Sequence, residues 1–497
     1  MSRTDWLFTP RNGLTLWALY HFIVWTFLPL ICNTCLPLDS IEAVMWGSQW
    51  QWGYDKHPPL SGWLAELFAE GFGDAGIYLL SQICVVTAGL GIYSLGRLLG
   101  ASAKQAVIAV LLLDTLYFCQ FISVEFNVNI VQMPFWAWGW FFGMHALLKR
   151  RMASWVGLGV CVALAALCKY IGVFLLIPLF AAWWARGELK KVLTNPGIYV
   201  AGIVSILLFL PHLLWMKQHD WITITYGIRR GASEQAYWWH HLLNPLEFIG
   251  MQAGILLPLI ILSLIGWRKG LKRGVKEDAP RGAMMLALAG YGSLVVLSLA
   301  IGMAPVTMWT APMPLAIGLW LVPRFGLEHI PKTVITTIAV MSMLFITAYG
   351  VTYGLGPQIR KKPHRVTHPG KELAAAVEKR WHDQYDRPLP FLVAYEFYGG
   401  IVNHYGQDEV AVMICGQTDR MTYLTDEEVH QQGGLVLWMK SRYSEDVHEM
   451  KSMDDVYPDL RERFPQIVEQ EDLIVPYPRK SDGLAGRYGI ATIPPRD

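Results

Sequence analysis

Three carboxylates and two basic side chains stand close together in the stretch that follows the first apolar segment. Asp39 and Glu42 come first, and Asp55, Lys56 and His57 follow. Two prolines come directly after His57, and the first restricts its backbone to extended geometry. A carboxylate can take a proton from an attacking group, and a fixed cation can bind a phosphate. We therefore take Asp39 and Glu42 as candidate catalytic residues, and Lys56, His57 and Asp55 as candidate substrate-binding residues.

The same residues also have plainer explanations. Asp39 could cap a short amphipathic helix over 40–49 that lies on the membrane, with its apolar side chains facing lipid or protein. Lys56 and His57 could be a basic pair attracted to lipid head groups. The tryptophans of this stretch, Trp46, Trp50 and Trp52, suit the aromatic belt of a membrane interface. Capping and catalysis do not exclude each other, so both explanations of Asp39 stay open.

Two further segments offer cations and aromatic residues. Lys169 and Tyr170 stand at the end of an apolar run. The loop 217–246 carries Arg229, Arg230 and His240 beside several tryptophans. We take these five residues as additional candidates for binding a charged substrate.

The elements that position these residues are membrane helices. Of the 497 residues, 53% are hydrophobic and only 16% are charged, with a mean hydropathy of +0.32. A soluble chain of this length would carry about a quarter charged residues. The net charge of +2 gives no basic face for nucleic acid. Composition therefore predicts an integral membrane protein and no nucleic-acid partner.

Apolar stretches of about 20 residues recur along the first 353 residues and predict about eleven transmembrane helices. The first is too long for the apolar core of a signal peptide, so we expect it to be retained. The predicted spans lie near residues 14–36, 76–96, 105–122, 130–148, 153–168, 170–186, 197–216, 247–267, 283–303, 306–323 and 333–353.

Lysine and arginine are concentrated in alternate loops, which predicts the orientation. The rich loops hold, among others, Lys104, Lys149, Lys190 and Lys272. By the positive-inside rule these loops are cytoplasmic. The loops 37–75 and 217–246, and the tail, then face the other side.

The last 140 or so residues have the composition of a water-soluble domain. Helical spacing covers 371–381, and strands are predicted near 390–398, 409–416, 434–440 and 472–478. The expected architecture is an all-α polytopic membrane domain over 1–353, with the loops 37–75 and 217–246, followed by a soluble α/β domain over 354–497.

The order of motifs resembles the polytopic GT-C glycosyltransferases. An acid after the first span, then a basic residue, Pro-Pro-Leu and a tryptophan, resembles their first periplasmic loop. The nearest groups are the bacterial protein-mannosyltransferase-like family and the aminoarabinose and galacturonic acid transferases acting on lipid A. Further similar segments are NVN at 127–129, CKYIGVFLLIP at 168–178, WTAPMP at 309–314 and AYEFYGGIVNHYG at 394–406. Several relatives have an aspartate where this chain has Asn127 or Asn129, and Glu125 is the nearest substitute.

The resemblance implies an inverting glycosyltransferase in a bacterial inner membrane, with its tail in the periplasm. The donor would be a polyprenyl-phosphate sugar and the acceptor a lipid A-type lipid. A protein acceptor is the alternative. Asp39 matches the family's acidic residue, and the position of Lys56 or His57 matches its Glu-Lys pair. No cofactor is certain, although a divalent metal ion is compatible with the carboxylates.

A transporter or flippase of lipid-linked sugars is a rival from another class. Such proteins place ionisable residues at mid-membrane and show paired repeats. Asp114 and His145 lie inside predicted spans, but the sequence has no visible repeat. The resemblance and the loop chemistry favour transfer over transport.

Overall fold

The chain forms two compact units. The computed structural model describes residues 9–231, 237–268, 278–359, 363–420, 422–441, 451–479 and 483–496. One unit comprises Met1–Phe27 and Tyr78–Thr347, and the other comprises Leu28–Ile77 and Ala348–Asp497. We call them the helical unit and the mixed unit. Three helices continue from one unit into the other: α1 (Pro10–Cys32), α3 (Leu60–Leu98) and α16 (Pro331–Tyr349).

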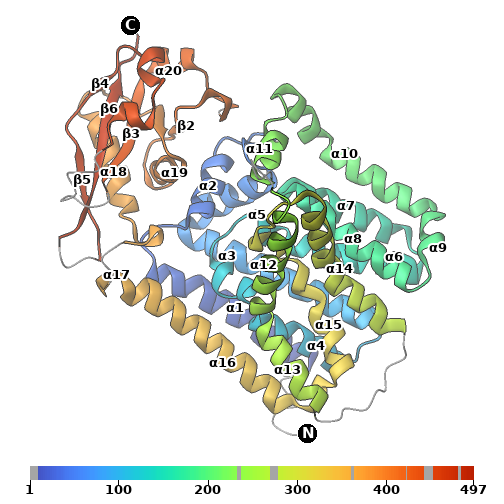
Figure 1. Ribbon diagram of the computed structural model, residues 1–497. Helices are drawn as coiled ribbons and strands as arrows, with labels where there is room; N and C mark the ends of the chain where they lie inside the picture. Colours follow the sequence, from blue (N-terminus) through green and yellow to red (C-terminus); the bar gives the residue numbers. More distant parts are fainter. Residues whose placement is uncertain are drawn as a thin grey trace. The chain divides into compact units, whose positions relative to one another are not determined.

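The helical unit is built from apolar helices packed side by side. Helix α7 lies between α6 and α10, and α14 packs against α8 (Figure 1). Short 3₁₀ segments separate several of the helices. The helices are α4 (Ala103–Leu111), α5 (Val128–Val131), α6 (Met133–Lys149), α7 (Met152–Cys168), α8 (Leu176–Ala185), α9 (Leu189–Leu193), α10 (Pro196–Gln218), α11 (Ile222–Gly231), α12 (His240–Ile255), α13 (Leu257–Arg268), α14 (Asp278–Ile301) and α15 (Ile317–Phe325). The 3₁₀ segments are η1 (Leu112–Thr115), η2 (Tyr117–Cys119), η3 (Phe121–Val124), η4 (Tyr170–Leu175), η5 (Thr307–Thr310), η6 (Met313–Ala316) and η7 (Leu327–His329).

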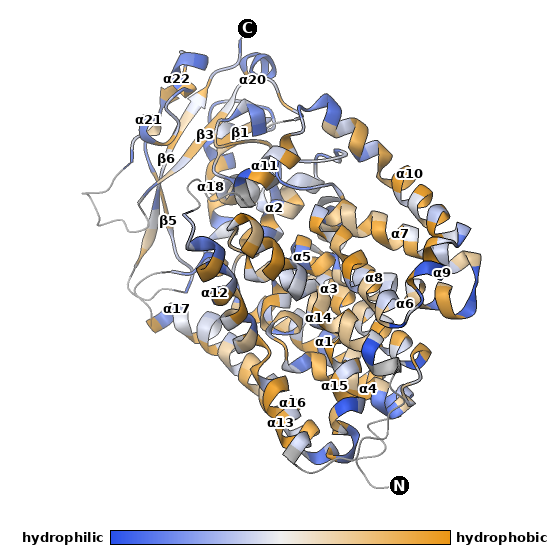
Figure 2. Ribbon diagram, turned by 45° about the vertical axis from the view of Figure 1, so that its right-hand side comes forward, coloured by the Kyte–Doolittle hydropathy of each residue, from blue (hydrophilic) through white to orange (hydrophobic). Residues whose placement is uncertain are grey.

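Within the described residues, five helices are long and apolar enough to cross a membrane, or seven if each of two bent pairs is one span. One pair covers 103–124 and bends by 88°, and the other joins α12 and α13 with a bend of 68°. Apolar side chains dominate these helices in Figure 2. The chain is thus a multi-pass membrane protein. Each of the eleven predicted stretches holds helix, but hydropathy alone does not distinguish a straight helix from a broken or short one.

A buried polar network holds the first break in place. The Asp114 carboxylate accepts hydrogen bonds from Trp17 Nε1 at 2.8 Å and lies 2.9 Å from His21 Nε2. Three residues after the break, Gln120 Oε1 accepts hydrogen bonds from Tyr20 and Trp25. Buried polar groups are costly unless they are paired. The network therefore gives Asp114 a structural role, because it joins α1 to the broken helix.

The mixed unit combines the stretch after α1 with the tail. Helix α2 (Leu38–Gly47) belongs to it. The tail contributes a six-stranded sheet of order β2-β1-β3-β6-β4, in which β5 also pairs with β6. The strands are β1 (Phe391–Ala394), β2 (Ala411–Ile414), β3 (Gly434–Ser441), β4 (Val468–Glu469), β5 (Leu473–Pro476) and β6 (Ala485–Ile493). The tail helices are α17 (Gly356–Ile359), α18 (Gly370–His382), α19 (Glu396–Tyr405), α20 (Asp426–Gln432), α21 (Met453–Val456) and α22 (Leu460–Arg463), with the short helical segments η8 (Gly350–Leu355), η9 (Arg365–Thr367) and η10 (Thr418–Arg420).

Strands β1, β2 and β3 run parallel, and α19 connects β1 to β2. The segment predicted as a strand over 390–398 therefore changes to helix at Glu396. Strand β6 was not predicted, although it lies in the middle of the sheet and pairs antiparallel with β3. The predicted α/β character of the tail and the helix over 371–381 are confirmed.

Helix α19 packs closely on α2 because Gly400 has no side chain. A β-carbon at Gly400 would lie 2.3 Å from Cγ2 of Ile41, which is fully buried. At the end of α19, the Tyr405 hydroxyl accepts a hydrogen bond from Leu36 N at 2.8 Å and donates one to Asp74 Oδ2 at 3.1 Å. Helix α19 thus holds the link between α1 and α2, the helix α2 and part of α3 within one unit.

We expect Gly400→Ala to destabilise the mixed unit by about 1–3 kcal/mol, because the new methyl group overpacks the contact with Ile41. Thermal unfolding in detergent measures the change. Gly202→Ala in α10 is the control, since a β-carbon there meets no atom within 4 Å. The double variant Ile41→Ala/Gly400→Ala should recover part of the loss, and an unchanged melting temperature for Gly400→Ala alone would contradict the expectation.

Candidate active site

Helix α2 carries both candidate catalytic carboxylates. Glu42 is buried and Asp39 is half-buried in the first turn. Residues 40–47 are all buried, so of the two alternatives for its apolar side chains, lipid or protein, the structure shows protein. Pro37 occupies the N-cap position, and no side chain caps the helix there. The capping explanation of Asp39 is therefore wrong, because α2 begins two residues earlier than the sequence suggested.

Lys56 lies between two carboxylates from distant parts of the chain. Its Nζ donates to Glu42 Oε1 at 2.5 Å and to Glu396 Oε1 at 2.7 Å. A tight turn presents it, in which Tyr54 N donates to His57 O at 3.0 Å. The three side chains are largely buried. Two of the three ammonium hydrogens are thus used within the protein.

The tail completes the group with an arginine. Arg420 Nε donates to Asp55 Oδ2 at 2.7 Å, and its Nη2 donates to Glu396 Oε2 at 2.7 Å. Glu396 follows β1, and Arg420 ends the short helix after β2. Both therefore lie at the carboxyl ends of parallel strands, where ligand sites of α/β sheets usually form. We call Glu42, Asp55, Lys56, Glu396 and Arg420 the Lys56 cluster.

The environment separates the pKa values of the two glutamates. Burial raises the pKa of Glu42 to about 8, although Lys56 opposes the shift. Burial also acts against ionised Glu396, but Lys56 and Arg420 together lower its pKa. Burial raises the pKa of Asp55 as well, against the effect of Arg420. The same cluster therefore favours the protonated form of Glu42 and the ionised form of Glu396.

Aromatic side chains pack around the loop that carries Asp55 and Lys56. Trp46 stacks on Tyr54 with ring centroids 5.7 Å apart, and both pack with Val412 and Ile414 of β2. The His57 ring meets Trp46 edge-on at 5.7 Å. Trp46 is therefore core rather than interface belt.

One oxygen of the cluster, Asp55 Oδ1, is buried and has no hydrogen-bond partner among the described residues. Because the other oxygen is fixed by Arg420, Oδ1 can accept a hydrogen bond from a substrate hydroxyl or water.

A second polar group lies in the helical unit. Lys169 Nζ donates to Asn129 Oδ1 at 2.9 Å and lies 5.5 Å from the ring centre of Trp309. The neighbouring Tyr170 hydroxyl lies 2.8 Å from His212 Nε2 and 2.5 Å from Thr223 Oγ1. Lys169 is half-buried, and it is a cation that can bind an anionic group.

The loop candidates are less enclosed. Arg229 is exposed on α11, and the side chain of Arg230 lies outside the described residues. His240 Nδ1, at the start of α12, accepts a hydrogen bond from Tyr237 N at 3.2 Å. The structure thus brings Glu42, Asp55 and Lys56 into direct or shared contact, whereas Arg229 and His240 lie in the other unit.

Among the residues that the structure describes, no group of three or more His, Cys, Asp or Glu side chains is arranged to hold a metal ion. The Lys56 cluster contains three carboxylates, but two cations lie between them.

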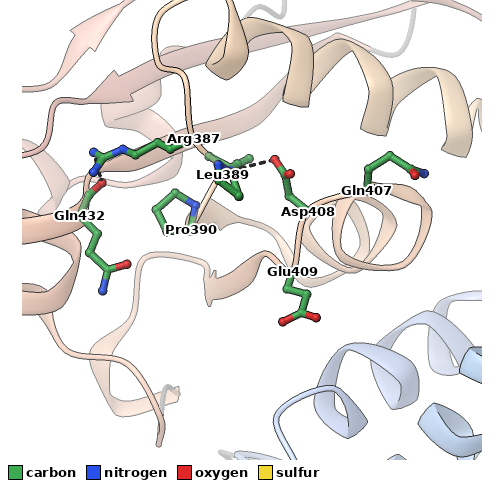
Figure 3. A pocket seen from close by; sticks show the side chains of 8 residues that line it. Arg387, Leu389, Pro390, Gln407, Asp408, Glu409 and Gln432 are labelled. Atoms are coloured by element: carbon green, nitrogen blue, oxygen red, sulfur yellow. Dashed lines mark hydrogen bonds between the residues drawn. The ribbon is translucent and has the colours of Figure 1, made fainter.

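Two cavities lie apart from the Lys56 cluster. One of about 470 Å³ opens at the amino ends of β1 and β2, lined by Arg387, Asp408, Glu409 and neighbours (Figure 3). Arg387 donates to the Gln432 carbonyl there, and Asp408 accepts from Leu389 N. The other, of about 460 Å³, lies in the helical unit beside both helix breaks, and its lining is mostly apolar. None of the predicted site residues lines either cavity.

Comparison with known proteins agrees with the predicted class. Residues 56–215 match the family model described as dolichyl-phosphate-mannose-protein mannosyltransferase. No curated protein sequence matches the chain.

Solved structures resemble the chain over nearly its full length. ArnT from Cupriavidus metallidurans bound to undecaprenyl phosphate has a TM-score of 0.62 at 13% identity, covering 97% of this chain and 98% of that one. The apo structure of the same ArnT has a TM-score of 0.60 at 12% identity, again covering 97% of this chain and 98% of that one. The mycobacterial arabinofuranosyltransferase AftD gives 0.50 at 12% identity, covering 97% of this chain and 40% of that chain.

These similarities and the family-model match confirm the predicted GT-C fold and the glycosyltransferase class. The chain is a polytopic membrane protein with a C-terminal domain containing a small sheet. At 12–13% sequence identity, these structures establish the fold alone. The substrates of this chain have to be inferred from its own site.

The sequence did not identify two members of the cluster. Glu396 lay within an expected strand, and Arg420 lies in the tail, for which the sequence predicted no site residue. A carboxylate that ends an apolar strand and starts a helix is a usable signal, because such residues gather at the carboxyl edge of a parallel sheet.

The raised pKa of Glu42 predicts a pH dependence of stability. Between the unfolded value, near 4.5, and about 8 the folded chain binds the extra proton. The free energy of unfolding therefore falls as pH rises through this window and levels off above it. Glu42→Gln should flatten the melting temperature between pH 6 and 8. Glu471→Gln, at an exposed position, is the control, and an unchanged slope in Glu42→Gln would contradict the assignment.

Replacing Lys56 should lower the free energy of unfolding more than replacing Glu42 does. Lys56→Met leaves three largely buried carboxylates with one arginine. We expect this to lower the free energy of unfolding by about 3–5 kcal/mol. Chemical or thermal unfolding in detergent measures the loss, with exposed Lys332→Met as the control. Adding Glu396→Gln should restore part of the stability. If Lys56→Met and Lys332→Met unfold alike, the cluster does not hold the unit together.

Proposed function

We propose that the chain transfers a sugar from a polyprenyl-phosphate donor to a lipid A-type acceptor at the outer face of a bacterial inner membrane. The observation that carries this proposal is the Lys56 cluster, in which an ordered cation lies beside carboxylates of different pKa. The GT-C fold and the likeness to ArnT bound to undecaprenyl phosphate support the choice of donor. The loops 37–75 and 217–246, and the tail, would face the periplasm.

Lys56 would bind the phosphate of the donor. Glu42 and Glu396 each accept a hydrogen bond from the Lys56 ammonium group. Its third hydrogen remains to be donated to a phosphate oxygen. With Glu42 protonated, the five side chains of the cluster carry no net charge, and so do not repel an anion as a fully ionised cluster would. Lys169 and His57 are further candidates for phosphate contacts.

Transfer proceeds by displacement at the anomeric carbon. The acceptor oxygen forms a bond to that carbon from the face opposite the phosphate, the carbon–oxygen bond to the phosphate breaks, and the configuration inverts. Cations stabilise the charge that builds on the departing polyprenyl phosphate. Asp39 takes the proton when the acceptor is a hydroxyl, or orients the acceptor when it is an ionised phosphate. Protonated Glu42 can donate a hydrogen bond to the leaving phosphate oxygen.

Glu396 and Arg420 act as positioning residues in this mechanism. Neither needs to touch the substrate, because Glu396 orients Lys56 and Arg420 fixes Asp55. The tail would thereby contribute to catalysis as well as to folding. A divalent metal ion is not required by any of these steps.

A protein acceptor is the second candidate. The family model that matches residues 56–215 describes a protein mannosyltransferase, which favours a serine or threonine hydroxyl. The two candidates share the donor and the cluster, and differ only in what the new sugar is attached to.

Mass spectrometry of lipid A and of envelope proteins from cells with and without the chain tests the proposal. We expect a sugar-sized mass difference on lipid A that depends on the chain. Asp39→Asn should reduce transfer by about 100-fold or more, as expected for loss of a general base. Asp386→Asn, at an exposed position, should leave transfer unchanged.

The outcomes separate the candidates. A mass difference on envelope proteins alone would favour transfer to a protein acceptor. Wild-type transfer by Asp39→Asn would remove Asp39 from the mechanism. No mass difference in either fraction would overturn the proposal.

A further inference from the structure

The cavity of about 470 Å³ in the tail lies where three parallel strands begin. Pro390, Glu409 and Gln432 line it, and they come just before β1, β2 and β3 in turn. The Lys56 cluster lies at the opposite, carboxyl ends of β1 and β2. The volume falls within the roughly 300–1,000 Å³ that is usual for small-molecule sites. We call this space the tail cavity.

Hydrogen bonds within the tail hold two sides of the tail cavity in place. Glu378 Oε1 accepts from Gln407 N at 2.6 Å and from Asp408 N at 2.9 Å. Asp408 Oδ2 accepts in turn from Leu389 N at 2.8 Å, and it lies 3.0 Å from His382 Nε2. The segment before β1 is thus tied to the segment before β2. The cavity is therefore formed by contacts of the chain itself.

A cation is fixed at one end of the tail cavity. Arg387 Nη2 donates to the Gln432 carbonyl at 2.8 Å, as Figure 3 shows. The guanidinium carbon lies 5.6 Å from the ring centre of Trp381 and 5.7 Å from that of Tyr385. A guanidinium has five N–H donors, so the bond to Gln432 leaves donors for a ligand.

The other polar side chains of the lining also have hydrogen-bonding capacity to spare. Gln407, Glu409 and Gln432 are exposed, and their side chains have no hydrogen-bond partner among the residues that the structure describes. Two amides and a carboxylate together offer donors and acceptors. The apolar part of the lining is the segment 388–390, which contains two prolines.

Charges of both signs line the tail cavity, and this decides the class of ligand. Arg387 repels a cation, whereas Asp408 and Glu409 repel an anion. A ligand with several uncharged hydroxyl groups avoids both repulsions, and each of its hydroxyl groups can donate and accept. The C–H face of a sugar ring can pack on the proline rings of 388–390.

We propose that the tail cavity binds a short uncharged carbohydrate. Arg387, Gln407, Glu409 and Gln432 would form hydrogen bonds with its hydroxyl groups. The site goes beyond the proposed transfer reaction, since it lies at the other ends of β1 and β2 from the Lys56 cluster and uses none of its residues. The carbohydrate can be a free glycan or the head group of a glycolipid, because both present the same rings and hydroxyl groups.

Saturation-transfer difference NMR on the full chain in nanodiscs tests the proposal, with maltose, cellobiose and mannobiose as probes. Sugar-based detergents are left out, because their head groups would compete. We expect at least one disaccharide to bind. The double variant Glu409→Ala/Gln432→Ala should weaken that binding about 10-fold or more, since it removes a carboxylate and an amide partner. Glu471→Ala, at an exposed position of the tail outside the cavity, is the control.

Three results would overturn the proposal. The first is that none of the disaccharides binds. The second is binding that the double variant leaves unchanged, because the sugar would then lie elsewhere in the protein. The third is binding of inorganic phosphate or of tetraalanine in place of the sugars, which would point to an anion site or a peptide site. The single variants Glu409→Ala and Gln432→Ala are measured as well, so that misfolding of the double variant leaves the test intact.

Two further arms separate the source of the carbohydrate and the two proposals. If diglucosyl diacylglycerol in the nanodisc suppresses binding of the free disaccharide, the ligand is a glycolipid head group, and if it does not, the ligand is a free glycan. Asp39→Asn, which removes the proposed base of the transfer reaction, should bind the disaccharide as the unchanged chain does. Loss of transfer and loss of carbohydrate binding are therefore observed separately.

Discussion

The pairing of Lys56 with Glu42 and Glu396 is the interaction on which the mixed unit depends. An ammonium ion in a largely buried position is unfavourable unless acceptors and opposite charge surround it. Here Glu42 of α2 accepts one hydrogen bond, and Glu396 of α19, 340 residues away in sequence, accepts another and supplies the negative charge. Arg420 then links Glu396 to Asp55. The first loop and the tail are therefore joined by charge as well as by the close contact of Gly400 with Ile41.

The chemistry of the first loop was visible in the sequence because its residues are close together. Lys56 and Glu42 are 14 positions apart, and rigid prolines follow the basic pair. The partners in the tail were not visible, because nothing in a local pattern connects Glu396 to Lys56. The surroundings of α2 stayed open for the same reason, since an amphipathic pattern does not say whether its apolar face meets lipid or protein.

The membrane helices also show that a local sequence pattern does not reveal contacts between distant residues. Apolar runs were located to within a few residues, and all of them hold helix. The bend near Leu116 was not predicted, because it is stabilised by hydrogen bonds of Asp114 and Gln120 to side chains of α1, about 90–100 residues earlier in the chain. Hydropathy reports the solvent that a segment prefers, whereas a break depends on which buried groups find partners. The sequence therefore predicted the class of the protein better than the details of its site.

The division of the mixed unit between the two ends of the chain sets an order for its assembly. Ribosomes make roughly 5–20 residues per second, so the tail emerges on the order of tens of seconds after the first loop. Through that interval Glu42, Asp55 and Lys56 have no Glu396 or Arg420 to meet, and Ile41 has no α19 to cover it. The helical unit can insert and pack during the same time, since its residues come between the two halves. For most of its synthesis a nascent chain therefore carries an incomplete mixed unit. The tail, which is made last, completes it.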